Sequence, residues 1–103
     1  MAQKTIVWTE TAIKQRREIL KYWTINNNST KYSEKLIGQI KKRIKLISRY
    51  PLSSKSTNHK DTRQAAMGNF SIYYKVEYSR IIITAFWDNR QNPEELLNLF
   101  EGN

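Results

Sequence analysis

The chain contains no cysteine, one histidine and only three glycines. Without cysteine it forms no disulfide, and one histidine leaves too few ligands for a transition-metal site. The glycines, Gly38, Gly68 and Gly102, are too scattered for a phosphate-binding loop. We therefore expect neither a metal nor a cofactor, and we interpret His59 as a surface loop residue.

Long hydrophobic runs are also missing. No apolar stretch approaches the roughly 20 residues that span a bilayer. The segment 1–8 lacks the apolar centre of a signal peptide. We therefore expect a cytoplasmic protein. A chain of 103 residues is the usual size of one domain, so we expect a single domain over residues 1–103.

Acidic residues are scarce relative to basic ones. Nine Asp and Glu oppose eighteen Lys and Arg, which gives a net charge of +9. Such a surface attracts nucleic acid, because each neutralised phosphate releases counterions. It equally attracts an acidic protein partner, or it serves only to keep a small protein soluble. We favour a polyanion or an acidic partner over solubility alone.

The first half of the sequence predicts a strand and a helical hairpin. Residues 4–9 are β-branched and aromatic, and Thr9 is a good N-cap for a helix that runs to about Thr24. Residues 26–29 favour a turn, and a second helix fits 30–49. Its stripe contains Leu36, Ile37, Ile40, Ile44 and Ile47. Gly38 inside it costs roughly 1 kcal/mol against alanine, so close packing is expected there. Tyr50-Pro51 ends it.

The second half predicts three strands and a short helix. Residues 52–61 are interpreted as a loop, 62–67 as a strand and Gly68-Asn69 as a tight turn. Residues 70–79 alternate between apolar and polar, and 81–87 form a continuous apolar run typical of a strand covered on both faces. Asn92-Pro93-Glu94 favours a helix start. The terminal helix carries Leu96, Leu97, Leu99 and Phe100, which either fold onto the sheet or await a partner.

The predicted fold is α+β with the order β-α-α-β-β-β-α. A helical hairpin packs on a mainly antiparallel four-stranded sheet, which the N-terminal strand joins at an edge or within it.

Several basic and aromatic side chains are candidates for one functional face. Arg63, Tyr73, Lys75 and Arg90 are predicted to converge on an exposed face of the strand meander. Arginine and lysine hold phosphate, and tyrosine stacks on a base. The alternative, equally supported by spacing, is that Arg63 and Arg90 pair with Asp61 and Asp88 at the surface. The cations Lys41, Lys42, Arg43 and Lys45 fan around a helix and are interpreted as a solvated face.

The order of these elements resembles the RelE/ParE superfamily of bacterial toxins. The supporting motifs are Ile6-Val7-Trp8-Thr9 before a helix, the hairpin ending in Tyr50-Pro51, and Gly68-Asn69-Phe70 with Tyr74 four positions later. The sequence Asp88-Asn89-Arg90-Gln91-Asn92-Pro93 is similar to a D-x-R-Q-N-P ending in one branch. The resemblance implies a toxin held inactive, in a hetero-oligomer, by a co-encoded acidic antitoxin.

The resemblance also implies one of two activities, which need different residues. RelE-like members cleave mRNA on the ribosome with a lysine pair on the second strand, an arginine on the third, an arginine after the fourth and a terminal tyrosine. Here those places hold Thr62 and Gln64, Ser71, Arg90, and Leu96 or a neighbour. Only Arg90 is retained. ParE-like members lack this set and inhibit DNA gyrase.

We therefore favour a ParE-like toxin that acts on gyrase. The alternatives are a RelE-like ribosome-dependent endonuclease and a non-toxic nucleic-acid-binding module. The catalytic candidates for the nuclease are Arg63, Tyr73 and Arg90. The target-binding candidates are Lys60, Arg63, Tyr73, Lys75, Asp88 and Arg90.

Overall fold

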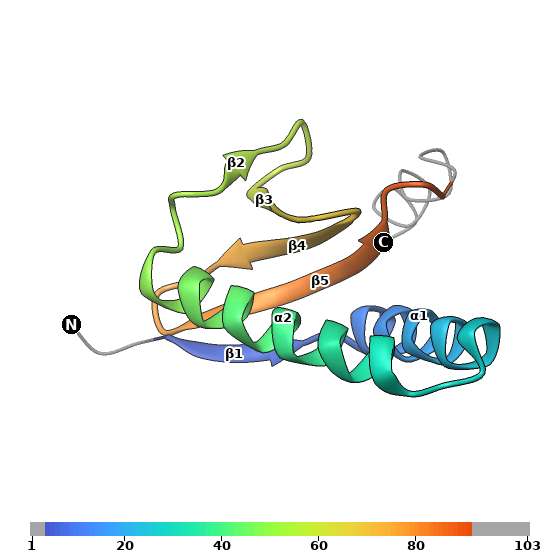
Figure 1. Ribbon diagram of the computed structural model, residues 1–103. Helices are drawn as coiled ribbons and strands as arrows, with labels where there is room; N and C mark the ends of the chain where they lie inside the picture. The colour runs from blue at the N-terminus through green and yellow to red at the C-terminus, as the bar shows by residue number, and fades with distance from the viewer. Residues whose placement is uncertain (1–3, 92–103) are drawn as a thin grey trace.

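The computed structural model describes residues 4–91 and contains a helical hairpin on one sheet (Figure 1). The elements in chain order are β1 (Thr5–Trp8), α1 (Glu10–Asn27), α2 (Lys31–Arg49), β2 (Lys55–Ser56), β3 (Thr62–Met67), β4 (Phe70–Val76) and β5 (Arg80–Asp88). The predicted terminal helix lies outside the described residues.

The sheet has five strands in the order β1-β5-β4-β3-β2. The first strand joins at an edge and runs parallel to β5, with Thr5 opposite Arg80, while the other neighbours are antiparallel. The α+β fold is therefore confirmed. The predicted count of four strands is wrong, because Lys55 and Ser56 pair with Gln64 and Arg63 as a short edge strand. Two residues are too few to show a strand periodicity in the sequence.

Both helices lie on the same face of the sheet (Figure 1). The Thr9 side chain accepts a hydrogen bond from the Ala12 amide and so caps α1, as predicted. This helix runs beyond Thr24 and ends where Asn28 adopts a left-handed conformation with φ 49°. The hairpin is fixed by a bond of 2.6 Å between the hydroxyls of Thr24 and Ser33.

The main core fills the space between the hairpin and the sheet. Its most deeply buried large side chains are Leu36, Ile72, Tyr74, Ile81, Ile83 and Phe86. Trp8 and Trp23 pack against this core. Gly38 does not mark a close approach: a Cβ built there meets nothing within 4 Å. The expectation of close packing at Gly38 is therefore wrong.

The predicted alternation places Phe70, Ile72 and Tyr74 on the helix-covered face of β4. The pairing with β5 shifts by one residue between Tyr73 and Tyr74, which is a β-bulge. The strand ends at Val76, earlier than predicted, and Tyr78 is 98% exposed. A second cluster of Tyr73, Ala85 and Trp87 is buried apart from the main core.

No helix within residues 4–91 is long and apolar enough to cross a membrane.

Candidate functional site

The sheet face opposite the helices carries the predicted candidates Tyr73 and Lys75. We call this surface the outer sheet face and define it by Gln64, Ser71, Tyr73, Lys75, Ala85 and Trp87. Directly paired residues share a face, and Tyr73 lies between Gln64 on β3 and Ala85 on β5. Ser71 is likewise opposite Trp87. The meander therefore brings strand residues from widely separated parts of the chain onto one surface.

A chain of neutral hydrogen bonds crosses the outer sheet face. The Gln64 amide Nε2 donates to Ser71 Oγ at 2.9 Å, and Ser71 Oγ donates to Asn89 Oδ1 at 2.8 Å. Ser71 is fully buried. Because its hydroxyl both accepts and donates, the polar atoms that surround it are satisfied without any charge. This network belongs to the fold, and the sequence interpretation of Ser71 did not foresee it.

Tyr73 and Lys75 differ sharply in their exposure. Burial raises the pKa of the Tyr73 phenol above its ordinary value, and its side-chain hydrogen bond with Ser71 lowers it by less. The phenol therefore stays protonated at neutral pH. Lys75 follows two residues later on the same face and is exposed. It is the candidate on this face that a macromolecular target can reach.

Arg63 does not join Tyr73 and Lys75. It pairs with Tyr74, so it points to the helix-covered side of the sheet. There its guanidinium Nη1 donates to the carbonyls of Leu52 and Ser54, while the Tyr74 hydroxyl donates to the Pro51 carbonyl at 2.7 Å. The predicted convergence on one face is wrong for Arg63, which anchors the segment after α2. It makes no ion pair with Asp61.

Arg90 also turns away from the outer sheet face. Its Nε and Nη2 donate to the two carboxylate oxygens of Asp88 at 2.9 and 2.8 Å, so the predicted Arg90–Asp88 pair is confirmed. The guanidinium carbon lies 5.1 Å from the Trp23 ring centroid and 5.9 Å from that of Phe70. Both rings belong to the helix side of the sheet. The predicted convergence is therefore wrong for Arg90 as well.

The Asp88–Arg90 pair perturbs both groups. Hydrogen bonding from the Arg90 side chain is the main cause that lowers the pKa of Asp88, and it outweighs the opposing effect of burial. The same bond raises the pKa of Arg90. Both side chains therefore remain charged at neutral pH and hold each other in place.

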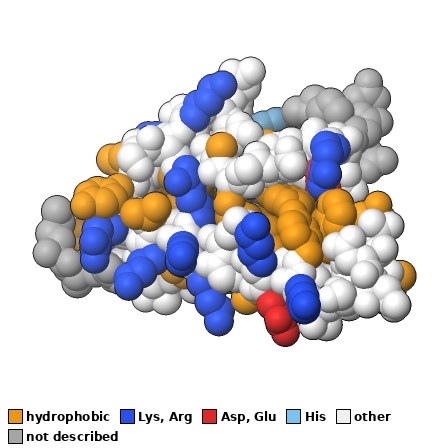
Figure 2. All heavy atoms as spheres, viewed as in Figure 1, with side chains coloured by type: hydrophobic (Ala, Val, Ile, Leu, Met, Phe, Trp, Pro, Cys, Tyr) orange, Lys and Arg blue, Asp and Glu red, His pale blue; other side chains and the backbone are white. Residues whose placement is uncertain are grey.

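The remaining cations are distributed over separate surfaces. Arg63 and Lys75 approach from opposite faces to line a groove of about 420 Å³ together with His59 and Glu77. Lys60 is exposed in the preceding loop. Lys41, Lys42 and Lys45 are exposed on α2, as predicted, and Lys and Arg side chains are spread over the helical side of the molecule (Figure 2). Arg43 is half-buried and departs from that prediction.

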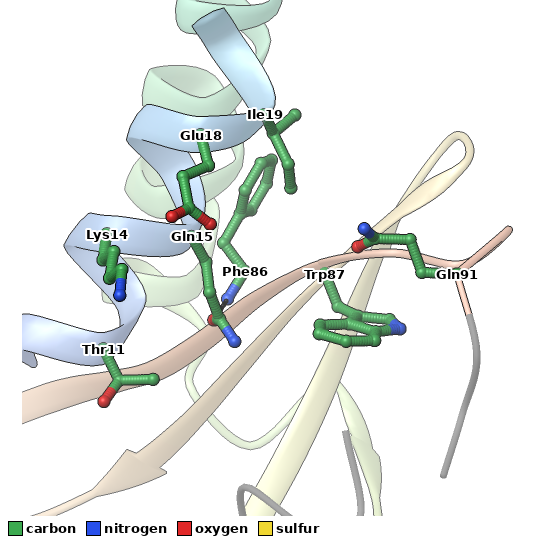
Figure 3. Close-up of a pocket in the computed structure, with 8 residues that line it drawn as sticks. All are labelled: Thr11, Lys14, Gln15, Glu18, Ile19, Phe86, Trp87 and Gln91. Atoms are coloured by element: carbon green, nitrogen blue, oxygen red, sulfur yellow. Dashed lines mark hydrogen bonds between the residues drawn. The ribbon is translucent and has the colours of Figure 1, made fainter. Parts of the chain in front are cut away.

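A further groove, of about 400 Å³, lies between α1 and the end of β5 (Figure 3). Gln15 reaches down from α1, and its Oε1 accepts the Phe86 backbone N–H at 2.9 Å. The lining also includes Lys14, Glu18 and Trp87. Sequence reasoning missed Gln15, because a side chain that caps a strand edge leaves no local signal.

The outer sheet face has neutral residues at three positions where RelE-like nucleases carry cations. The three places where RelE-like enzymes carry cations, Thr62, Gln64 and Ser71, do lie on this one face. All three are neutral: Gln64 and Ser71 belong to the hydrogen-bond network, and Thr62 is buried. RNA cleavage needs cations that stabilise the charged transition state, and none stands at these three positions. Residues 4–91 likewise contain no cluster of acidic or histidine side chains that could hold a metal ion.

The helical hairpin on one face of this mixed sheet is the architecture expected of a toxin of the RelE/ParE class. The family model described as "ParE toxin of type II toxin-antitoxin system, parDE" matches residues 6–93. The chain therefore belongs to the ParE toxin family and is the toxin component of a type II toxin–antitoxin system.

A solved structure has the same fold. It is titled "Chromosomal ParDE TA system from P. aeruginosa" and superposes with a TM-score of 0.70 at 15% sequence identity. The match covers 82% of this chain and 94% of that one. No curated protein sequence matches this chain.

Proposed function

We propose that this ParE toxin inhibits growth by binding DNA gyrase, and that a co-encoded acidic antitoxin holds it inactive in the cytoplasm. The observation that carries the proposal is the neutral Gln64–Ser71–Asn89 network on the outer sheet face. It occupies the surface where a RelE-like nuclease concentrates its cationic groups. Inhibition by binding requires no such groups, only a complementary surface.

The contact surface for the target is proposed to include Lys75 and Lys60, which are exposed. Two further residues support this contact surface from within the sheet. Tyr73 is buried beside Ser71, and Arg63 anchors residues 52–54. Asp88 and Arg90 fix the end of β5 next to this surface. The charge of +9 favours association with an acidic antitoxin, which is expected to neutralise the toxin in a hetero-oligomer.

The decisive experiment compares two targets in parallel with the same purified toxin. We expect inhibition of gyrase supercoiling, with no cleavage of mRNA on translating ribosomes. Addition of the co-encoded antitoxin is expected to restore supercoiling. Cleavage of ribosome-bound mRNA, with supercoiling unaffected, would instead establish the RelE-like activity and overturn the proposal.

A pair of variants tests the proposed contact surface. Lys75→Ala removes an exposed cation from the outer sheet face and is expected to weaken gyrase inhibition about tenfold, as for a lost interfacial charge. Lys21→Ala removes an exposed cation from α1 and serves as the control for the loss of one charge. Equal inhibition of gyrase by both variants would show that Lys75 is not part of the contact surface.

A further inference from the structure

The solvent side of α2 carries a row of basic side chains, which we call the α2 cation row. Its members are Lys31, Lys35, Lys42, Lys45 and Arg49, and all of them are exposed. Successive members lie three, four or seven residues apart, close to whole turns of the helix, so they stand in line along about 27 Å. The buried stripe of α2 lies on the opposite side of the helix. Figure 2 shows Lys and Arg side chains along this face of the molecule.

The charges of the α2 cation row are not compensated within the described chain. Glu34 is the only acidic residue of α2, and it accepts a hydrogen bond from the Thr30 hydroxyl at 3.4 Å. No member of the row forms an ion pair with a carboxylate of the described residues. On α1, by contrast, Lys14 has Glu10 and Glu18 four residues before and after it. Opposite charges attract at this helical spacing, so only the α2 cation row is left without matching acids.

This arrangement lowers the stability of the helix. Like charges three or four residues apart on a helix repel one another, as Lys42 and Lys45 do. Lys31 is the first residue of α2, where the helix dipole disfavours a cation. A partner with a regular series of negative charges relieves this repulsion, because each of its charges meets a cation of the row. The α2 cation row therefore favours a polyanion.

The surroundings of the α2 cation row favour duplex DNA over other polyanions. Single-stranded nucleic acid is held by aromatic side chains on which bases stack, and the row contains none. A helix that binds a membrane inserts its apolar face into the lipid, but the apolar face of α2 packs in the core. The narrow major groove of duplex RNA excludes side chains, whereas that of B-form DNA admits an α-helix.

Gly38 lies within the row, three residues after Lys35 and four before Lys42. A Cβ at this position meets no atom within 4 Å, so packing within the described chain does not require a glycine here. Glycine inside a helix also lowers its stability relative to alanine. Without a side chain, the backbone of α2 is open to close approach by a ligand at the middle of the row. A sugar–phosphate backbone that lies along the row fits this gap.

We propose that α2 lies against the major groove of duplex DNA and that the α2 cation row binds its phosphates, whatever the base sequence. Lysine and arginine position a protein on DNA through phosphates without reading the bases, and each neutralised phosphate releases counterions. The inference goes beyond the proposed inhibition of gyrase, because it concerns the binding of DNA by the toxin alone. A toxin that inhibits gyrase gains from it a second contact, to the DNA that the enzyme holds.

The test measures the affinity of purified full-length toxin for a fluorescent DNA duplex of mixed sequence, by anisotropy at several salt concentrations. Five phosphate contacts predict a slope of about −4.5 for the logarithm of the affinity against that of the salt concentration. The double variant Lys42→Gln/Lys45→Gln is expected to bind at least about tenfold more weakly, with a slope of about −2.7. Lys14→Gln/Lys21→Gln removes two exposed lysines from α1 and is the matched control, which is expected to keep the wild-type slope.

Thermal unfolding of both double variants separates a binding defect from a folding defect. If either double variant fails to fold, the single variants Lys42→Gln and Lys14→Gln replace the pair. Equal loss of affinity on α1 and α2 would show that net charge alone attracts DNA, and would overturn the inference. Tighter binding of duplex RNA, of single-stranded DNA or of anionic lipid vesicles than of duplex DNA would overturn it as well.

The same proteins distinguish this inference from the proposed function. Inhibition of gyrase by a toxin that does not bind duplex DNA would refute the inference and leave the proposed function intact. Binding of duplex DNA through the α2 cation row, without inhibition of gyrase, would refute the proposed function and leave the inference intact.

Discussion

The guanidinium of Arg90 lies 5.1 Å from the ring centroid of Trp23, across the boundary between the end of β5 and α1. The same group is held by both carboxylate oxygens of Asp88. Cation–π contact and a bidentate ion pair together fix its orientation. In this toxin the arginine after β5 therefore secures the fold on the helix side, and it does not face the outer sheet face.

The Asp88–Arg90 pair predicts an acid-sensitive contribution to stability. The folded-state pKa of Asp88 is lowered, so the unfolded chain binds its proton first as the pH falls. The contribution is complete above the unfolded pKa of about 3.9 and is lost as the pH falls through that value towards the folded one. We expect Asp88→Asn to unfold more easily than wild type at pH 7, with a smaller difference at pH 3. Urea unfolding of both proteins between pH 7 and pH 3 measures this difference in the free energy of unfolding.

The control for this prediction is Glu77→Gln, which removes a carboxylate from a solvent-exposed pair with Arg80. Exposed pairs contribute little to stability, so this variant is expected to follow the wild-type curve closely. A difference between Asp88→Asn and wild type that stays constant from pH 7 to pH 3 would contradict the assignment.

Ser71 is predicted to support the outer sheet face through its hydrogen bonds with Gln64 and Asn89. Ser71→Ala leaves the Gln64 amide and the Asn89 carbonyl oxygen without their partner. We expect a loss of about 1–2 kcal/mol in the free energy of unfolding, measured with urea. Ser79→Ala, on an exposed turn, is the matched control and is expected to be neutral. Equal stabilities for the two variants would show that the network contributes nothing measurable.

Gly38 offers a stabilising substitution. It lies inside α2, and a Cβ at this position meets no atom within 4 Å. Gly38→Ala is expected to raise the free energy of unfolding by about 1 kcal/mol, because alanine has the higher helix propensity. Gly68→Ala is the contrasting control: its φ of +60° disfavours any side chain, so a loss of about 1 kcal/mol is expected. Chemical denaturation of both variants checks that the free energy of unfolding rises for Gly38→Ala and falls for Gly68→Ala.

The elements that the sequence predicted well have strong local patterns. The turn at Gly68-Asn69 and the alternation that begins at Phe70 specify the β3–β4 hairpin, and Thr9 specifies the start of α1. The same turn also determines on which face of the sheet Arg63 lies, which the predicted convergence of Arg63 with Tyr73 did not take into account. A two-residue turn places Met67 opposite Phe70, and counting back places Arg63 opposite Tyr74 and away from Tyr73.

Other parts of the site depend on tertiary contacts that no local pattern reports. The β-bulge between Tyr73 and Tyr74 is defined only against β5. The position of Arg90 depends on Trp23, which is distant in sequence, and spacing could suggest its ion pair with Asp88 but not this ring contact. Ala66 has no strand partner on the β2 side because β2 begins only at Lys55, which the composition of residues 52–61 did not indicate.

The parallel pairing of β1 with β5 joins the two ends of the described chain, since Thr5 lies opposite Arg80. A ribosome releases the first strand long before its partner. Until β5 emerges, the hydrogen-bonding edge of β1 and the apolar surface of the helical hairpin lack their main cover. Contacts between such distant residues slow folding, because a long loop must close before they form. Synthesis of this toxin therefore includes an interval in which its sheet cannot yet be completed.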